Sequence, residues 1–172
     1  MKKILFVCHG NICRSPMGEY ILKYLTGNKY IIESRATSLE EVGNDMYYEA
    51  KNILSKYNIP YDKHIARQIT IDDYDSFDII ICFDNYNLKN IKRITGDDSK
   101  VIKLLDKDIE DPWYTRDFDK VYNEIYEGCI KLINKLDDKW YKKSNYFKFI
   151  ALFTASLILS IENGLFSISI TS

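Results

Sequence analysis

The chain has 172 residues, of which 46% are hydrophobic and 28% charged, a composition typical of one folded domain with a tail. Its 24 basic and 25 acidic residues nearly cancel, which disfavours a nucleic-acid-binding protein, because neutralising several phosphates needs an excess of Lys and Arg. The apolar run Ile4–Val7 is shorter than the ~7 residues that a secretory signal needs, so we expect a cytoplasmic protein with free thiols.

Strands and helices are predicted to alternate along most of the chain, from short apolar runs and from apolar residues at helical spacing. This alternation predicts an α/β fold: a doubly wound three-layer sandwich around a parallel sheet of about four to five strands. The expected strands are Lys3–Val7, Tyr30–Glu33, Phe77–Phe83 and Lys100–Leu104. The expected helices are Ser15–Leu25, with Ser15 as its cap, then Asp45–Tyr57, Asn87–Ile94 and Asp117–Leu136.

The first strand leads through the loop Cys8–Ser15 directly into the first helix. A loop between the carboxyl end of a parallel strand and a helix N-terminus is a favoured site for anions, phosphate above all. The spacing of Cys8 and Arg14 lets the backbone amides curl round one tetrahedral oxyanion while the guanidinium binds two of its oxygens. We expect Gly10 and Asn11 to adopt the left-handed backbone angles that such a curl requires.

The same loop contains a candidate nucleophile. Its positive surroundings favour a Cys8 thiolate aimed at phosphorus, and Ser15 can donate a hydrogen bond to that sulfur when it departs. We expect Asp111 to donate a proton to the leaving oxygen. It lies in a Pro-containing loop after a later strand, and the order of the sheet should place this loop at the same edge as Cys8. Trp113 and Tyr114 beside it would form an aromatic wall for a flat substrate ring.

These residues carry a resemblance to a known family. The segment Val7–Pro16 (VCHGNICRSP), joined to Asp111-Pro112-Trp113, resembles the low-molecular-weight protein tyrosine phosphatases. The similarity extends from Lys3 to about Leu136. Other matching segments are Ser34–Ser38, Ala66–Ile69, Phe77–Asp84 and Asn87–Leu88.

The resemblance implies an enzyme without metal or cofactor that hydrolyses phosphotyrosine in protein substrates through a phosphocysteine. It implies that Cys8 is the nucleophile, that Arg14 binds the phosphate and that Asp111 is the general acid and base. Asn11 and Ser15 would hold the loop and the thiolate, and Cys13 would be a second thiol able to cap Cys8 under oxidation. Ile12 favours phosphotyrosine, since threonine at this position marks the phosphoarginine branch.

Several further residues are expected at the rim or in the core. His9 and Glu40 would lie at the rim of the cleft, where this chain also departs from the family. It has no aromatic residue near Leu39–Glu40 and lacks the frequent prolines in Asp45–Tyr48. We expect core packing for Cys82 and Cys129, and a solvated loop for Asp72, Asp73 and Asp75.

Two other functions are open from the sequence. An arsenate reductase would share the fold and the anion loop, but it needs a further redox cysteine pair. Position 89 is Lys89, and no cysteine lies between 83 and 128. A phosphotyrosine-binding module would retain the loop without turnover, although every catalytic position is filled. No metal site is expected, because no histidine pair accompanies Cys8 and Cys13.

The segment 139–172 is predicted to be a separate tail. Its four lysines and one glutamate give a net charge of +3, against −4 for residues 1–138. The charge-free run Phe149–Ile161 would span roughly 20 Å as a helix, less than the ~30 Å core of a membrane. A segment folded back on the domain and a shallow membrane association both fit this pattern. We predict that residues 1–138 carry full activity and that the tail affects only solubility or location.

Overall fold

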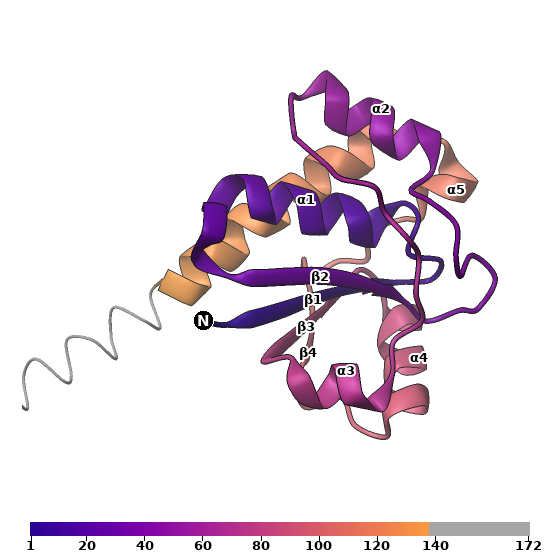
Figure 1. Cartoon of the computed structure of the whole chain (residues 1–172), viewed down its shortest axis with the longest axis vertical. Helices are drawn as coiled ribbons and strands as arrows, with labels where there is room; N and C mark the ends of the chain where they lie inside the picture. The colour runs from indigo at the N-terminus through magenta and orange to yellow at the C-terminus, as the bar shows by residue number, and fades with distance from the viewer. Residues whose placement is uncertain (138–172) are drawn as a thin grey trace, which may run out of the picture. The chain divides into compact units, whose positions relative to one another are not determined.

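The computed structural model of the chain describes residues 1–137, apart from the side chain of Asn28 (Figure 1). Residues Met1–Leu132 form one compact unit. No helix within residues 1–137 combines the length and the apolar character that crossing a membrane requires. The predicted tail over 139–172 lies outside the described residues, so its packing and its membrane association stay predictions.

A parallel sheet of four strands forms the centre of this unit, in the order β2-β1-β3-β4. β1 lies between β2 and β3, with Cys8 at its end opposite Ala36. The doubly wound α/β prediction is therefore confirmed, and β2 runs beyond its predicted end at Glu33. The strands are β1 (Lys3–Cys8), β2 (Ile31–Ala36), β3 (Ile79–Cys82) and β4 (Val101–Lys103).

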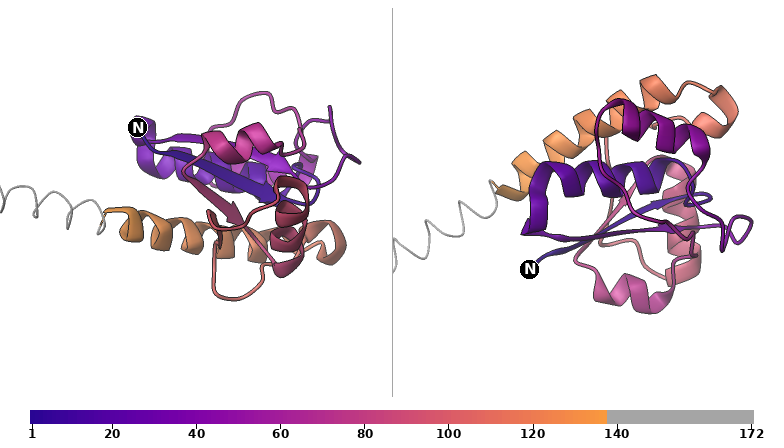
Figure 2. Two further views of the ribbon diagram at one scale, coloured as in Figure 1. Left: turned by 90° about the horizontal axis from the view of Figure 1, so that it is seen from below. Right: turned by 45° about the horizontal axis from the view of Figure 1, so that its top comes forward.

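Helices cover both faces of the sheet (Figures 1 and 2). α1 and a helix that begins at residue 118 lie on one face, and α3 and α4 lie on the other. A short 3-10 helix, Gly27–Lys29, follows α1. The helices labelled in Figure 1 are α1 (Arg14–Thr26), α2 (Tyr48–Lys56), α3 (Ile71–Ser76), α4 (Asn85–Thr95) and α5 (Pro112–Thr115).

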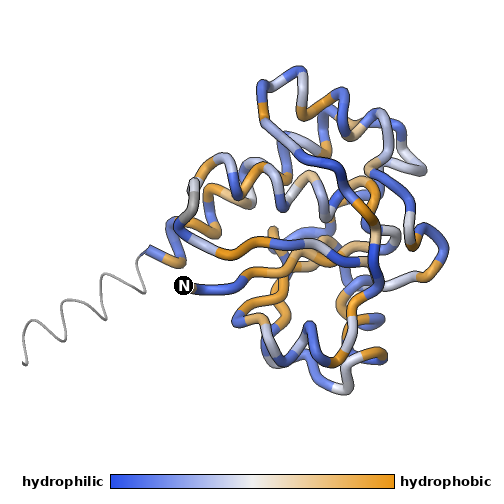
Figure 3. The backbone as a smooth tube through the Cα atoms, in the orientation of Figure 1, coloured by the Kyte–Doolittle hydropathy of each residue, from blue (hydrophilic) through white to orange (hydrophobic). Residues whose placement is uncertain are grey.

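The alternation of side chains along β1 explains the two cores. Leu5 and Val7 belong to a buried cluster that includes residues of α3 and α4. Phe6 points to the opposite face, where a Cβ on Gly18 would lie 2.7 Å from its ring, so only glycine lets α1 pack this closely. Apolar colouring accordingly runs along the inner strands, with hydrophilic colouring towards the outer turns (Figure 3).

The core prediction for the two outlying cysteines is confirmed. Cys82 and Cys129 are both fully buried. Burial raises the pKa of Cys82 to about 12 and also raises the pKa of Cys129, so both are neutral thiols. Their place in the sheet and in the helix from residue 118 gives them a packing role.

Three predicted helix starts are wrong. α1 begins at Arg14 with Cys13 as its N-cap, so Ser15 lies inside the first turn and is not the cap. α2 begins at Tyr48, and residues 45–47 precede it in a non-helical conformation. α4 begins at Asn85, before its predicted start at Asn87. Apolar periodicity located all three helices but not their first residues.

The loop prediction for Asp72, Asp73 and Asp75 is also wrong, because these residues form α3. Thr70 accepts a hydrogen bond from the backbone N–H of Asp73, and the Asp73 carboxylate accepts one from the backbone N–H of Thr70. This capping box starts the helix. Asp73 also forms an ion pair with Arg35 of β2 at 3.0 Å, which ties α3 to the sheet.

Candidate active site

The loop Cys8–Ser15 follows β1 at the carboxyl edge of the sheet, where a phosphate-binding loop was predicted. Asn11 has a left-handed φ of 59°, as expected. Gly10 does not have a positive φ, so that part of the prediction is wrong. Gly10 instead provides space, because a Cβ there would lie 3.1 Å from Cγ of Glu41.

Asn11 is fully buried and holds the loop in shape. Its Nδ2 donates to the hydroxyls of Ser15 and Ser34, each at 2.9 Å, and its Oδ1 accepts from the backbone N–H of Arg67 at 3.1 Å. Nε2 of His64 lies 2.7 Å from the Asn11 carbonyl oxygen, which can only accept, so Nε2 carries the proton. Burial lowers the pKa of His64, which keeps this ring neutral.

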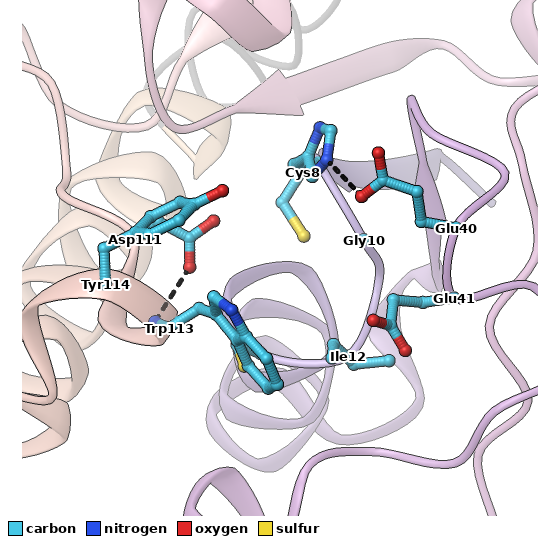
Figure 4. Close-up of a pocket in the computed structure, with 10 residues that line it drawn as sticks. Cys8, Gly10, Ile12, Glu40, Glu41, Asp111, Trp113 and Tyr114 are labelled. Atoms are coloured by element: carbon cyan, nitrogen blue, oxygen red, sulfur yellow. Dashed lines mark hydrogen bonds and ion pairs between the residues drawn. The ribbon is translucent and has the colours of Figure 1, made fainter.

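Two groups converge on the sulfur of Cys8, which is itself buried. The backbone N–H of Asn11 donates to Sγ at 3.3 Å, and Oγ of Ser15 lies 3.1 Å from the same atom. Figure 4 shows the sulfur pointing into the space between the labelled side chains. Hydrogen-bond donors directed at a sulfur stabilise its anionic form. The loop is therefore suited to hold a thiolate.

Arg14 is 2% exposed, and its guanidinium is held from several directions. Nη1 donates to Oδ2 of Asp84 at 2.6 Å and to the carbonyl of Ile109 at 2.9 Å, and Nη2 donates to Oδ2 of Asp111 at 2.5 Å. Burial opposes its charge, but the negative groups of Asp111, Cys8 and Asp84 raise the pKa of Arg14. Nε has no hydrogen-bond partner within residues 1–137. One buried cationic donor thus stays available for a ligand.

Asp111 reaches the site from the N-terminus of α5. Its Oδ1 accepts from the backbone N–H of Trp113 at 3.1 Å and caps the helix, and its Oδ2 contacts Arg14. The segment was predicted as a loop, but Pro112 at the first helical position starts a single turn. The structure therefore brings Asp111 from a distant part of the sequence to Cys8 and Arg14.

An open cleft with a cavity volume of about 60 Å³ lies over these groups. In Figure 4, Asp111 and Tyr114 lie on one side of the Cys8 sulfur, and Glu40 and Glu41 lie on the other. The cleft is lined by Cys8, His9, Gly10, Ile12, Cys13, Glu40, Glu41, Asp111, Trp113 and Tyr114.

The predicted rim residues lie at the mouth of this cleft. Nε2 of His9 is 3.1 Å from Oε2 of Glu40, so the two side chains are in contact with each other. Cys13 lies deeper, and burial together with the nearby Cys8 raises the pKa of Cys13, which keeps it a neutral thiol. In the part of the chain that the structure describes, no three His, Cys, Asp or Glu side chains form a group that could hold a metal ion.

Several residues that line or contact the site were not predicted from the sequence, and Glu41 of the cleft lining is one of them. Asp84 binds Arg14 and also caps α4, and an aspartate between a buried strand and a helix could have indicated it. Ser34 and His64 hold Asn11 from distant segments, and no local pattern marks them. Tyr47 packs its ring against Trp113 with centroids 5.0 Å apart.

Comparisons with known proteins agree with this geometry. The family described as "Low molecular weight phosphotyrosine protein phosphatase" matches residues 3–143. A relative of that name from Gallus gallus is 39% identical over 152 residues, which cover 78% of this chain and 96% of the relative. The crystal structure of a low molecular weight protein tyrosine phosphatase from Streptococcus pyogenes is 42% identical, with a TM-score of 0.78, and the match covers 83% of this chain and 98% of that one.

A solved structure of a Drosophila arginine phosphatase is also similar, at 28% identity and a TM-score of 0.72. That match covers 79% of this chain and 98% of the other. The segment matched by the family contains the whole of the cleft, from Cys8 to Tyr114. The chain therefore belongs to the low molecular weight phosphotyrosine protein phosphatase family, a family of enzymes.

Proposed function

We propose that the chain hydrolyses phosphotyrosine monoesters in proteins through a phosphocysteine formed on Cys8. The observation that carries this proposal is the meeting of three groups in one cleft. They are a sulfur with two hydrogen-bonding neighbours, a buried arginine with an unpartnered Nε, and a carboxylate 2.5 Å from that arginine. This is the set that phosphoryl transfer to a thiolate needs.

In the first step the Cys8 thiolate attacks phosphorus, an S–P bond forms, and the bond from phosphorus to the tyrosyl oxygen breaks. Asp111, protonated, gives its proton to that leaving oxygen. The loop amides and the free Nε of Arg14 bind the non-bridging oxygens, where charge is concentrated. The phosphoryl group replaces part of the contact between Nη2 and Asp111, which frees the acid for the leaving group.

In the second step Asp111, now a carboxylate, takes a proton from water while the water oxygen attacks phosphorus. The S–P bond breaks and its electron pair returns to Cys8, so inorganic phosphate and the thiolate are the products. Ser15, 3.1 Å from the sulfur, stabilises the departing thiolate by hydrogen bonding. Because the cycle requires a free thiol, we place the enzyme in the reducing cytoplasm.

Phosphotyrosine is favoured over phosphoarginine by the lining of the cleft. Ile12 and the aromatic side chains of Trp113 and Tyr114 offer an apolar slot for a flat ring. An arsenate reductase lacks support, since α4 carries Lys89 where a second redox cysteine would be needed. A binding module without turnover is disfavoured by Asp111 beside Arg14. Activity of residues 1–138 alone and weak membrane association through 139–172 belong to the same proposal.

The test compares hydrolysis of phosphotyrosine, phosphoserine and phosphoarginine by wild type, Cys8→Ser and Asp111→Ala. We expect phosphotyrosine to be preferred, Cys8→Ser to lose at least about 10⁴-fold in kcat/KM, and Asp111→Ala about 10²-fold to 10³-fold. Asp106→Ala, which removes another exposed acid of the same connection, is the matched control and should retain full activity. Near wild-type turnover by Cys8→Ser would rule out the mechanism.

A further inference from the structure

We propose that Tyr47 is a positioning residue which, together with Arg116, holds α5 against the phosphate-binding loop. Through α5 it would set the place of Trp113 and of the Asp111 carboxylate. The inference rests on the proposed function, since it concerns how the acid side of the same cleft is held. It follows from three sets of contacts around Tyr47.

The backbone of Tyr47 is attached to the phosphate-binding loop. Its N–H donates to the carbonyl oxygen of Ile12 at 2.9 Å, and its own carbonyl accepts from the N–H of Lys51 at 3.1 Å as α2 begins. Tyr47 is thus the residue at which α2 meets the loop. A side chain starting from this point has a position fixed relative to Cys8 and Arg14.

The ring of Tyr47 extends from there to residues on either side of the C-terminus of α5. It meets Trp113 edge-on, with centroids 5.0 Å apart and planes at 66°, and it stacks on Phe118 at 6.0 Å. Edge-on aromatic pairs of this kind contribute more than their buried area alone. Tyr47 is therefore packed against the residues before and after the C-terminus of α5.

Arg116 completes the attachment. It ends α5 with a left-handed φ of 60°, and its Nη1 donates to the hydroxyl oxygen of Tyr47 at 3.0 Å. Its guanidinium lies 5.1 Å from the centroid of Trp113, and Nη1 is 3.6 Å from Oε2 of Glu49 on α2. A planar guanidinium can stack on a ring and donate a hydrogen bond at once, which a lysine cannot.

α5 depends on such contacts because it has only four residues. A single helical turn has no stability of its own, so its position must come from its two ends. The N-terminal end is tied by Asp111 to Arg14, and the C-terminal end is tied by Arg116 to Tyr47. When substrate displaces Arg14 from Asp111, the second contact is the one that keeps the acid in place.

Proton donation is more sensitive to such a displacement than phosphate binding is. Shifts of about 1 Å can cost up to about 10²-fold in rate when a reacting group loses its geometry. Phosphate binding depends on the loop and on Arg14, neither of which changes if the C-terminal end of α5 is released. Releasing Arg116 from Tyr47 should therefore harm only substrates whose leaving group needs a proton.

The experiment measures kcat/KM of wild type, Tyr47→Phe, Arg116→Ala and the double variant with two aryl phosphates. Phenyl phosphate has a poor leaving group, and 2,4-dinitrophenyl phosphate has a good one that hardly needs an acid. We expect each variant to lose about 10-fold with phenyl phosphate and less than about 2-fold with the dinitrophenyl ester. The double variant should lose no more than Arg116→Ala alone, because that substitution already removes the contact with the Tyr47 hydroxyl.

Tyr57→Phe is the matched control, since it removes a tyrosine hydroxyl at the other end of α2 and keeps the ring stacked on Tyr122. It should behave as wild type. Equal losses with the two esters, additive losses in the double variant, or no loss at all would overturn the proposal. Failure of the proposed function is a separate result, in which wild type hydrolyses neither ester or Cys8→Ser hydrolyses both.

A second measurement tests the placement of α5 without turnover. In a Trp140→Phe background, Trp113 is the remaining tryptophan of the chain and reports on its own surroundings. We expect Tyr47→Phe and Arg116→Ala to increase quenching of its fluorescence by acrylamide, while Tyr57→Phe does not. Unchanged quenching in both variants would overturn the proposal whatever the enzyme hydrolyses.

Discussion

The two sides of the cleft are built in different ways. On the phosphate side, Asn11 is fully buried and Arg14 is 2% exposed, and both are held by several hydrogen bonds from the interior. On the acid side, Trp113 is 38% and Tyr114 77% exposed, on a helix of four residues. One side is part of the core of the protein, and the other is attached to its surface.

This difference matches the demands of the two tasks. A phosphoryl group presents the same tetrahedral oxygens in every substrate, so its site gains from rigid donors that need no rearrangement. The leaving group and the peptide that carries it vary, and water must enter for the second step. A side held by few contacts can accommodate both.

Arg14→Lys should disable the phosphate side. The substitution keeps a positive charge but removes the planar fork that binds Asp84, Ile109 and Asp111 while leaving Nε free. We expect kcat/KM for phenyl phosphate to fall about 10³-fold, with a similar loss for the dinitrophenyl ester. Unlike the Arg116 substitution, this loss should not depend on the leaving group. A loss confined to phenyl phosphate would show that the contrast between the two sides is wrong.

Asn11→Ala should show how much the contacts of the phosphate side contribute to the free energy of unfolding. It removes two hydrogen bonds donated by Nδ2 and one accepted by Oδ1, and it puts alanine at a φ of 59°. We expect the free energy of unfolding to fall by about 3 kcal/mol in urea titrations. Asn58→Ala is the control, because Asn58 is exposed with a φ of 56° and should lose only about 1 kcal/mol. Equal losses would mean that the hydrogen bonds of Asn11 contribute nothing.

The two sides also differed in how far the sequence predicted them. Cys8, Arg14 and Ser15 were found because they lie within one short segment, where spacing alone determines which groups meet. Asp111 was found from the topology of the sheet. The attachments of these residues were not found. Asp84 was marked only by its place between a strand and a helix, and His64 and Tyr47 reach the site through tertiary packing.

The same reasoning explains the errors in the fold. The strands and the long helices have enough residues for an apolar period to be visible. α3 and α5 have six and four residues, too few to show a period, and each is started by one cap. The capping pattern Thr70-x-x-Asp73 was present in the sequence and was the signal that could have predicted α3. At position 10 the glycine suggested a left-handed backbone angle, whereas in the structure a glycine is needed there to leave space for Glu41.

Trp113→Ala should weaken the acid side without affecting the phosphate side. The ring lines the cleft and packs against Tyr47, so its loss removes the wall for the substrate ring. We expect KM for phenyl phosphate to rise about 10-fold, while the inhibition constant of inorganic phosphate changes less than about 2-fold. Tyr114→Ala should have a smaller effect, because that side chain is 77% exposed. A parallel change in phosphate inhibition would indicate that the two sides are not independent.

His64, which contacts the phosphate side, should make the stability of the folded protein depend on pH. Burial holds the pKa of His64 below its usual 6.5, so the unfolded chain binds a proton at pH values where the folded chain does not. The free energy of unfolding should therefore fall as the pH drops below about 6.5, by up to about 1.4 kcal/mol per pH unit from this group. His64→Gln, which can still donate to the Asn11 carbonyl, should show a shallower fall in denaturant titrations between pH 7.5 and 5.5. Identical pH profiles would contradict the role given to His64.

In the proposed mechanism the phosphoryl group passes through the sulfur of Cys8. Rapid quenching of the enzyme during turnover of an aryl phosphate, followed by mass spectrometry of its peptides, tests this directly. We predict one phosphoryl group on Cys8 in wild type, more of it in a variant with a slowed second step such as Asp111→Ala, and none in Cys8→Ser. Turnover with no phosphorylated Cys8 in either wild type or Asp111→Ala, or a phosphoryl group on another residue, would contradict the mechanism.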